Sequence, residues 1–122
     1  MRFVYKSVEL AQRSAEQLHS QLDSEHFTAL YAASDEKLHQ AASETDFVKL
    51  LDAVHRKLGN VQQSSLRNTG VAWFAVQGAT VTLVDETKFA QGTGVEKFLW
   101  HIKDNGAALY GYNINSNELI TK

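Results

Sequence analysis

The sequence predicts a single α+β domain over residues 1–122, in which about three N-terminal helices pack on a curved, four-stranded antiparallel sheet. Apolar residues in the first half of the chain recur at steps of three and four, which is the period of a helix. From Val61 onward the apolar period changes to two, which is the period of a strand. Tight turn sequences such as Asn105-Gly106 separate the later apolar runs, and such turns join antiparallel neighbours.

The first predicted helix carries one apolar stripe and is expected to end near Asp23 and Ser24, whose side chains suit a helix boundary. The stripe consists of Val4, Val8, Ala11, Ala15, Leu18 and Leu22. The segment 26-HFTALYAAS-34 then predicts a short helix, or a helix followed by a turn through Ser34-Asp35. A further short turn is expected around Leu38.

The third helix is the most clearly marked element. Ser43 precedes it and Asp46 follows three residues later, which approximates a capping box. Gly59 is expected to end it in the left-handed conformation that glycine adopts readily. The predicted buried stripe of this helix is Phe47, Leu50, Leu51, Val54 and Leu58.

Four strands are expected over about residues 63–76, 79–90, 95–103 and 107–116. The turns between them are predicted at Gln77-Gly78, Gly92-Thr93-Gly94 and Asp104-Asn105-Gly106. In the second strand, Val81, Leu83 and Phe89 share one face. Strands of ten or more residues exceed the usual length of about five or six and curl with their twist. A curled sheet around helices encloses a hollow, so a cone-like shape is expected.

The last hairpin, 98-FLWHIKDNGAALYGYNI-114, allows two registers. A two-residue Asn105-Gly106 turn pairs His101 with Tyr110 and Trp100 with Gly111, where the missing side chain leaves room for the indole. A three-residue loop shifts the pairing by one and places Trp100 opposite Tyr110. The two-residue turn is the preferred prediction.

The preferred register divides this hairpin into two faces. The apolar face consists of Phe98, Trp100, Ile102 and Leu109. The amphipathic face consists of Leu99, His101, Tyr110, Tyr112 and Ile114. The hairpin is therefore expected to be structural first, with any site on its amphipathic face.

Composition excludes several classes of function. The net charge is −2 and the basic residues are scattered, so no nucleic-acid partner and no anionic lipid surface is expected. The absence of cysteine excludes disulfides, thiolate catalysis and cysteine-bound metal. No apolar run approaches the roughly 20 residues of a membrane span. The N-terminus does not read as a signal peptide, so the chain is expected to be cytoplasmic as given, or periplasmic or secreted if a leader was removed.

Motifs for metals, phosphates and nucleophiles are lacking in the sequence. Its histidines (His19, His26, His39, His55 and His101) show no ligand spacing, and isolated surface positions are expected for them. Gly92 and Gly94 precede no helix, so they are expected to form a hairpin loop and not a phosphate cradle. No GxSxG elbow is present. No metal and no cofactor is therefore expected.

General acid–base chemistry is the one catalytic class that the residues leave open. The candidate groups are His101, Tyr31, Tyr110, Tyr112, Asp85 and Glu86. Asp85 and Glu86 are expected to form cross-strand surface pairs with basic neighbours. The aromatic residues of the strands either fill the core or line an apolar hollow, and the inward strand face decides between the two.

The element order and two segments, 46-DFVKLLDAVHRKLGNV-61 and 106-GAALYGYNINS-116, carry a family likeness. Over roughly Leu10 to Ser116 the chain resembles the nuclear transport factor two-like (cystatin-like) α+β cone superfamily, and within it uncharacterised bacterial domains of unknown function. The resemblance implies the cone fold. It also implies a range of functions, because members include isomerases, dehydratases, ligand binders and dimerisation modules. Its enzymes often use an Asp or His in the hollow, and many of its unknown-function members look exported or lipid-anchored.

These observations together predict a non-catalytic domain that binds a small apolar or amphipathic molecule, or a protein, and that forms a homodimer through its sheet. The alternative is a small general acid–base enzyme, similar to an isomerase, dehydratase or hydrolase, acting in the cone. The residues predicted to contact a ligand are His101, Tyr110, Tyr112, Trp73 and Tyr31.

Overall fold

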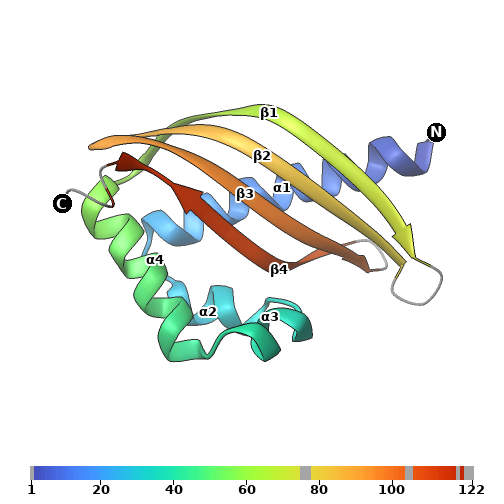
Figure 1. The fold of residues 1–122 in the computed structure, drawn as a ribbon, viewed down its shortest axis with the longest axis horizontal. Coiled ribbons are helices and arrows are strands. Elements are labelled where there is room, and N and C mark those ends of the chain that lie inside the picture. Colours follow the sequence, from blue (N-terminus) through green and yellow to red (C-terminus); the bar gives the residue numbers. More distant parts are fainter. Residues whose placement is uncertain (1, 75–77, 104–105, 118, 120–122) are drawn as a thin grey trace.

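A computed structural model describes residues 2–74, 78–103, 106–117 and 119, and it confirms the predicted α+β class. Two long helices and two short ones precede the sheet (Figure 1): α1 Arg2–Asp23, α2 Phe27–Ala32, α3 Glu36–Ala41 and α4 Glu44–Leu58. The strands are β1 Val61–Phe74, β2 Gly78–Phe89, β3 Gly92–Lys103 and β4 Gly106–Asn115. They form one antiparallel sheet in the order β1-β2-β3-β4, which is curved and unclosed.

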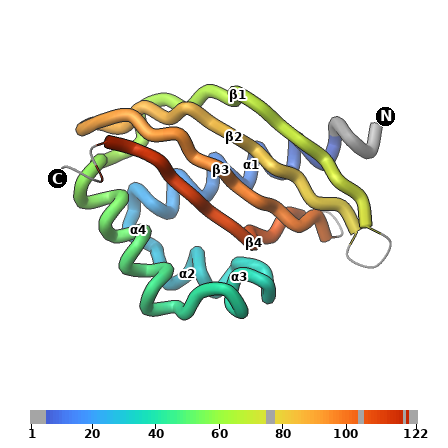
Figure 2. The backbone as a smooth tube through the Cα atoms, in the orientation of Figure 1, coloured from blue at the N-terminus to red at the C-terminus, as the bar shows by residue number. Residues whose placement is uncertain are grey.

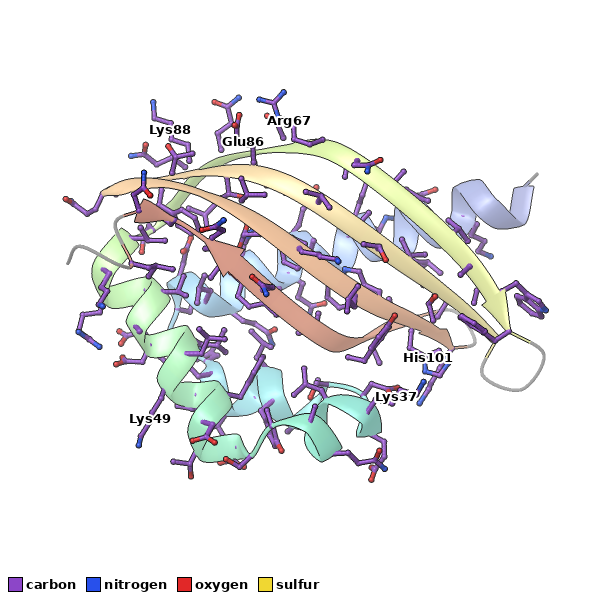
Figure 3. The ribbon with its side chains drawn as sticks, in the orientation of Figure 1. Lys37, Lys49, Arg67, Glu86, Lys88 and His101 are labelled. Carbon is purple, nitrogen blue, oxygen red and sulfur yellow. The ribbon has the colours of Figure 1, made fainter. Side chains whose placement is uncertain are left out.

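The helices all lie against one face of the curved sheet (Figures 1 and 2). Helix α1 runs beneath the strands, α4 lies at the end where β1 begins, and α3 lies next to β4. The outer face of the sheet points away from the helices, as Figure 3 shows for Arg67, Glu86 and Lys88. The sheet and helices therefore enclose one core, and the outer face of the strands is polar around these three residues.

The core consists of the inward face of the strands and the stripes of α1 and α4. Val81, Leu83 and Phe89 are buried on one face of β2, as their alternation predicted. The α4 stripe is confirmed, except that Leu50 is 37% exposed because it lies at the edge of the stripe. The other α4 stripe residues are at most 5% exposed. The α1 stripe is confirmed from Val8 onward, and the side chain of Val4 lies outside the described residues.

Two predicted helix boundaries are confirmed and one short helix was missed. The side chain of Ser43 accepts a hydrogen bond from the Asp46 amide at 3.1 Å, and Gly59 ends α4 with φ +80°. The expected turn around Leu38 is in fact helix α3. Its N-cap is Asp35, whose carboxylate accepts from the amide of Lys37 at 3.0 Å and stabilises the first turn.

The predicted turn at Gly92-Thr93-Gly94 is wrong. Gly92 already belongs to β3 and pairs with Phe89, and the two strands are joined through residues 90–91. Gly94 serves packing and not a turn, because a Cβ there would lie 3.0 Å from Cδ1 of Ile114. In the expected Gln77-Gly78 turn, Gly78 has φ +81°, while residues 75–77 lie outside the described residues.

The preferred register of the last hairpin is also wrong. Trp100 pairs with Leu109 and not with Gly111, because Gly106 is itself a strand residue paired with Lys103. Residues 104–105, part of the predicted turn, lie outside the described residues. The register shifts between Leu99 and Trp100, so Tyr110 is an extra residue, a β-bulge, in β4.

The bulge changes which β4 side chains face the core. Before it, Trp100 and Leu109 form the predicted apolar face and are 4% and 2% exposed. Beyond it, the pairing follows the alternative register, with Phe98 opposite Tyr112. Tyr112 and Ile114 therefore turn inward and pack on the core beside Phe98, so the prediction that they lie on the face opposite Phe98 is wrong.

Candidate functional site

On the inward face of β2 and β3, three polar residues lie among the apolar ones. Asp85 and Thr87 continue the buried alternation of β2, and Glu96 occupies an inward position of β3. Asp85 and Glu96 are direct cross-strand partners. Glu96 and Thr87 are each 0% exposed, and Asp85 is 8% exposed. Polar side chains are uncommon inside a core and need hydrogen-bond partners there, so these three residues mark an unusual region of the core.

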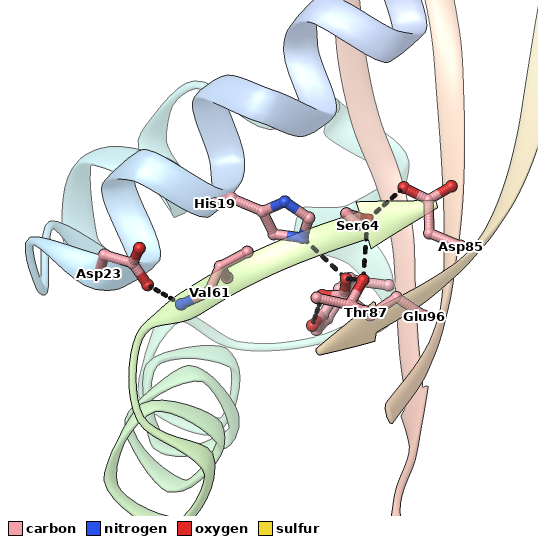
Figure 4. A network of polar contacts seen from close by, with 8 residues as sticks. His19, Asp23, Val61, Ser64, Asp85, Thr87 and Glu96 are labelled. Carbon is pink, nitrogen blue, oxygen red and sulfur yellow. Dashed lines mark hydrogen bonds and ion pairs between the residues drawn. The ribbon is translucent and has the colours of Figure 1, made fainter. Parts of the chain in front are cut away.

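Glu96 is the centre of a hydrogen-bonded network (Figure 4). Its Oε1 lies 2.7 Å from Nε2 of His19 on α1 and accepts from the Thr87 hydroxyl at 2.5 Å. Its Oε2 accepts from the Tyr112 hydroxyl at 2.5 Å. The His19 ring also packs edge-on against Phe98, with ring centroids 5.8 Å apart. The carboxylate therefore has three donors and a fixed orientation.

Asp85 lies at the other end of this network. The hydroxyl of Ser64 is 2.9 Å from Asp85 Oδ2 and 2.9 Å from the hydroxyl of Thr87, which joins the two halves (Figure 4). The other carboxyl oxygen of Asp85, Oδ1, is buried and has no hydrogen-bond partner among the described residues. A buried carboxyl oxygen without a partner makes the ionised form of Asp85 energetically costly, and this favours its protonated form.

A pocket of about 100 Å³ opens beside the network, between α1 and the first two strands. It exists because β1 is an edge strand whose inner face is only partly covered by α1; Leu66 on that face is 40% exposed. The lining residues are Gln12, Ala15, Glu16, His19, Ser64, Leu66 and Asp85. The wall is therefore mostly polar, and three of its residues, His19, Ser64 and Asp85, belong to the hydrogen-bonded network.

The network shifts the pKa values of its members. Burial alone would lower the pKa of His19, but the hydrogen bond and negative charge of Glu96 raise it above its ordinary value. Burial raises the pKa of Asp85; the bond to Ser64 opposes this and the charge of Glu96 adds to it. Burial and the charge of Glu96 raise the pKa of Tyr112 well above its ordinary value, so its hydroxyl stays protonated.

The five predicted ligand residues do not form one site. Tyr112 belongs to the Glu96 network. Tyr31 donates its hydroxyl to the carbonyl of Ala42 at 2.9 Å and stacks on His39 with centroids 4.4 Å apart. Trp73 is 67% exposed near the end of β1.

His101 and Tyr110 both face the start of α3. Nδ1 of His101 lies 3.1 Å from Oδ1 of Asp35, and the ammonium of Lys103 lies 2.8 Å from the same oxygen. The ammonium of Lys37 lies 5.9 Å from the ring centre of Tyr110. These contacts hold the α2–α3 connection onto the sheet, so this second cluster has a structural explanation.

Sequence reasoning misjudged the most important residues. Glu86 does form the expected surface pair, with Arg67, but Asp85 is buried and its expected surface pairing is wrong. His19 was expected at the surface and is 8% exposed, while Glu96 was not singled out. A signal was present, because His19 continues the Ala15–Leu18–Leu22 stripe at helical spacing.

No helix in the described part of the chain is long and apolar enough to cross a membrane. Across the same residues, no three acidic or histidine side chains come close enough to hold a metal ion. The chain matches no protein-family model and no curated protein. Fold and site thus define an α+β domain with helices packed on a curved four-stranded sheet, compatible with a cone, with a buried polar network beside a small pocket.

Proposed function

We propose that this chain is a ligand-binding domain of the nuclear transport factor two-like cone type, and that it binds a small polar molecule in the pocket between α1 and β1. The observation that carries the proposal is the placement of His19. Its Nε2 is held by Glu96, its ring lines the pocket, and Nδ1 points away from Glu96 (Figure 4). Nδ1 has no hydrogen-bond partner among the residues that the structure describes, so it is available to a ligand.

The lining of the pocket supports a polar ligand over the apolar one that the sequence suggested. Gln12 and Glu16 stand on α1 at the same wall as His19, and Ser64 and Asp85 face them from the strands. A volume of about 100 Å³ suits a molecule of a few heavy atoms. Small-molecule sites commonly combine such a concave shape with a few convergent polar groups.

The test is a fragment screen by NMR, with the ring resonances of His19 as the reporter and those of exposed His26 as the internal reference. A binder is expected to shift His19 and not His26. Gln12→Trp should cover the pocket and abolish the shift, while Ser20→Trp, exposed on the same helix and outside the lining, should retain it. Shifts that persist in Gln12→Trp would place the ligand elsewhere and reject the proposal.

A second candidate function is general acid–base chemistry at the same wall. The His19–Glu96 pair supports it, because a carboxylate that orients an imidazole and raises its pKa makes the imidazole a better base. A small ketone such as acetone in D₂O tests it. Nδ1 would take an α-proton while a proton from the pocket goes to the carbonyl oxygen. The proton on Nδ1 then exchanges with D₂O, and the reverse step returns deuterium to carbon. Exchange above background that is lost in His19→Gln supports catalysis; exchange equal to background rejects it.

The homodimer remains part of the proposal and is supported by apolar side chains exposed on β1. Leu66, Trp73 and Phe74 are 40%, 67% and 46% exposed. Exposed aromatic residues on one strand favour contact with a second copy. Sedimentation should give a dimer that weakens in Phe74→Ser, with Val95→Ser, an equally exposed apolar residue on β3, as the control. A monomer at all protein concentrations would reject this part.

A further inference from the structure

The network between the two buried carboxyl groups contains too few hydroxyl hydrogens for its contacts. Three oxygen–oxygen contacts lie in series: Asp85 to Ser64 at 2.9 Å, Ser64 to Thr87 at 2.9 Å, and Thr87 to Glu96 at 2.5 Å. All three distances fall in the hydrogen-bond range of about 2.5–3.0 Å for hydroxyl groups. Each contact needs one hydrogen, so the series needs three.

The two hydroxyl groups supply only two of these hydrogens. If Asp85 and Glu96 were both ionised, Thr87 would donate to Glu96 and Ser64 to Asp85. The contact between Ser64 and Thr87 would then hold no hydrogen, and two oxygen lone pairs would face each other at 2.9 Å. The third hydrogen must therefore come from one of the two carboxyl groups.

The surroundings of the two groups decide which of them carries it. Glu96 has donors from His19, Thr87 and Tyr112, and these stabilise an anion. Asp85 has a single polar neighbour, Ser64, and its Oδ1 is buried without a donor, which is far more costly for an anion than for a neutral acid.

The register gives a third, independent reason. Asp85 and Glu96 are direct cross-strand partners on the buried face of the sheet, where two like charges repel each other strongly. A neutral Asp85 removes this repulsion. The charged groups that reach this region from other elements are His19 and Glu16 on α1, both lining the pocket with Asp85, and Glu96 on β3.

We infer that Asp85 is a neutral carboxylic acid at neutral pH and the donor end of a directional chain, Asp85 to Ser64 to Thr87 to Glu96, that connects two sides of the pocket wall as a proton relay. Every hydrogen in the chain then has one donor and one acceptor. Glu96 in turn accepts from Nε2 of His19, so the chain ends on the ring that lines the same pocket.

The relay conserves protons and charge. Asp85 passes its hydrogen to Ser64, Ser64 passes its own to Thr87, and Thr87 passes its own to Glu96. The products are ionised Asp85 and neutral Glu96, with all three hydrogen bonds reversed. No proton enters or leaves, and one negative charge moves from Glu96 to Asp85. The negative charge therefore lies either on Asp85, which lines the pocket, or on buried Glu96, which contacts the lining residue His19.

The inference has one consequence that rests on the proposed function. It specifies the class of ligand that the pocket binds. With Asp85 neutral and Glu96 paired to His19, the wall formed by the buried network carries no unpaired negative charge; Glu16, the other carboxyl group of the lining, occupies an exposed position on α1. An uncharged polar molecule with hydrogen-bonding groups fits this wall better than a cation does. Acetamide and acetamidinium have the same heavy-atom shape and differ in charge, so they form a matched pair of probes.

The protonation of Asp85 is tested by a pH titration of the side-chain carboxyl ¹³C resonances, without any ligand. Asp85→Asn assigns the resonance, and Asp52, a half-exposed residue of α4, serves as the control in the same spectra. Asp85 is expected to stay neutral at pH values well above the ordinary aspartate pKa of about 3.9. An Asp85 that ionises near this ordinary value overturns the inference.

Two variants of the middle residue test the relay itself. Thr87→Val cuts the chain and frees the Ser64 hydrogen to stabilise an ionised Asp85, so the titration midpoint of Asp85 should fall. Thr87→Ser should restore it. An unchanged midpoint in Thr87→Val rejects the relay; if that variant does not fold, the wild-type titration alone decides whether Asp85 is neutral.

The two probes separate this inference from the proposed function. Stronger shifts of His19 with acetamide than with acetamidinium support both. Stronger shifts with acetamidinium, together with an ionised Asp85, leave the pocket as a binding site and reject the neutral wall. If neither probe shifts His19 and no fragment binds, the proposed function fails, while the titration of Asp85 still supports or rejects the relay.

Discussion

Tyr112 donates its hydroxyl hydrogen to Glu96 at 2.5 Å, although strict alternation along β4 would have turned its ring away from the core. The bulge at Tyr110 shifts the alternation by one residue and brings Tyr112 opposite Phe98 on the inner face. One extra residue in a strand therefore completes the donor set of a buried carboxylate.

The contribution of this bond can be measured with Tyr112→Phe. The change leaves Oε2 of Glu96 without its donor, and a buried acceptor that loses its partner costs about 1–3 kcal/mol. Urea denaturation should show a loss of that size. Tyr110→Phe on the same strand is the control and should stay within about 0.5 kcal/mol of the wild type. Equal stability of both variants would mean that the bond contributes nothing.

The pair of His19 and Glu96 should make stability depend on pH. The pKa of His19 is raised in the folded state, so the protonated ring favours folding. This stabilisation is fully present below the unfolded pKa of about 6.5 and is lost as the pH rises through the folded pKa. This stabilisation amounts to about 1.4 kcal/mol for each pH unit by which the folded pKa of His19 exceeds the unfolded one.

The measurement is the free energy of unfolding between pH 5 and pH 9. The wild type should lose stability across the upper part of this range. Glu96→Gln should flatten the loss, because it removes the charge that raises the pKa of His19. A slope that survives Glu96→Gln would assign the effect to other groups.

The fold could be predicted from the sequence because its elements are marked locally. The stripe of α4, its cap at Ser43 and its end at Gly59 all depend on residues within one helix, and they were predicted correctly. The four strands follow from the change of period and from short connections. Only α3 was missed, since its single buried apolar residue, Leu38, cannot establish a helical period.

The site could be predicted only in part because it depends on tertiary contacts. His19 and Glu96 are 77 residues apart, and no local pattern pairs them. Asp85 was recognised as sharing a face with Leu83, yet an acidic residue on a strand suggested the surface. The bulge at Tyr110 has no marker in the sequence, so the inward turn of Tyr112 could not be foreseen.

Asp35 should contribute stability that acid removes. Burial would raise its pKa, but the contacts with Lys103, Lys37 and His101 lower it below its ordinary value. An acid with a lowered pKa stabilises the fold above the unfolded pKa of about 3.9 and loses this effect as the pH falls through the folded pKa. Asp35→Asn should therefore cost about 1–3 kcal/mol at pH 7 and progressively less below pH 4.

Asp35→Ala separates the charge from the cap. Asn at position 35 can still accept from the Lys37 amide, whereas alanine cannot, so Asp35→Ala should cost about 1 kcal/mol more at every pH. Thermal unfolding at a series of pH values gives both differences. A penalty for Asp35→Asn that is the same at pH 3 and pH 7 would show that the charge plays no part.

Gly111 leaves room for a facing side chain, as predicted, but that side chain belongs to Leu99 and not to Trp100. The bulge places it opposite Leu99, and a Cβ at position 111 would lie 2.7 Å from Cδ1 and 3.3 Å from Cβ of that leucine. Gly111→Ala should therefore cost about 1–3 kcal/mol through overpacking. Leu99→Ala in the same chain should recover most of the loss, because it removes the clashing atoms.

Gly70→Ala on β1 is the control, since nothing lies within 4 Å of a Cβ there, and its stability should not fall. If Gly111→Ala proves as well tolerated as Gly70→Ala, the pairing of Gly111 with Leu99 beyond the bulge is wrong.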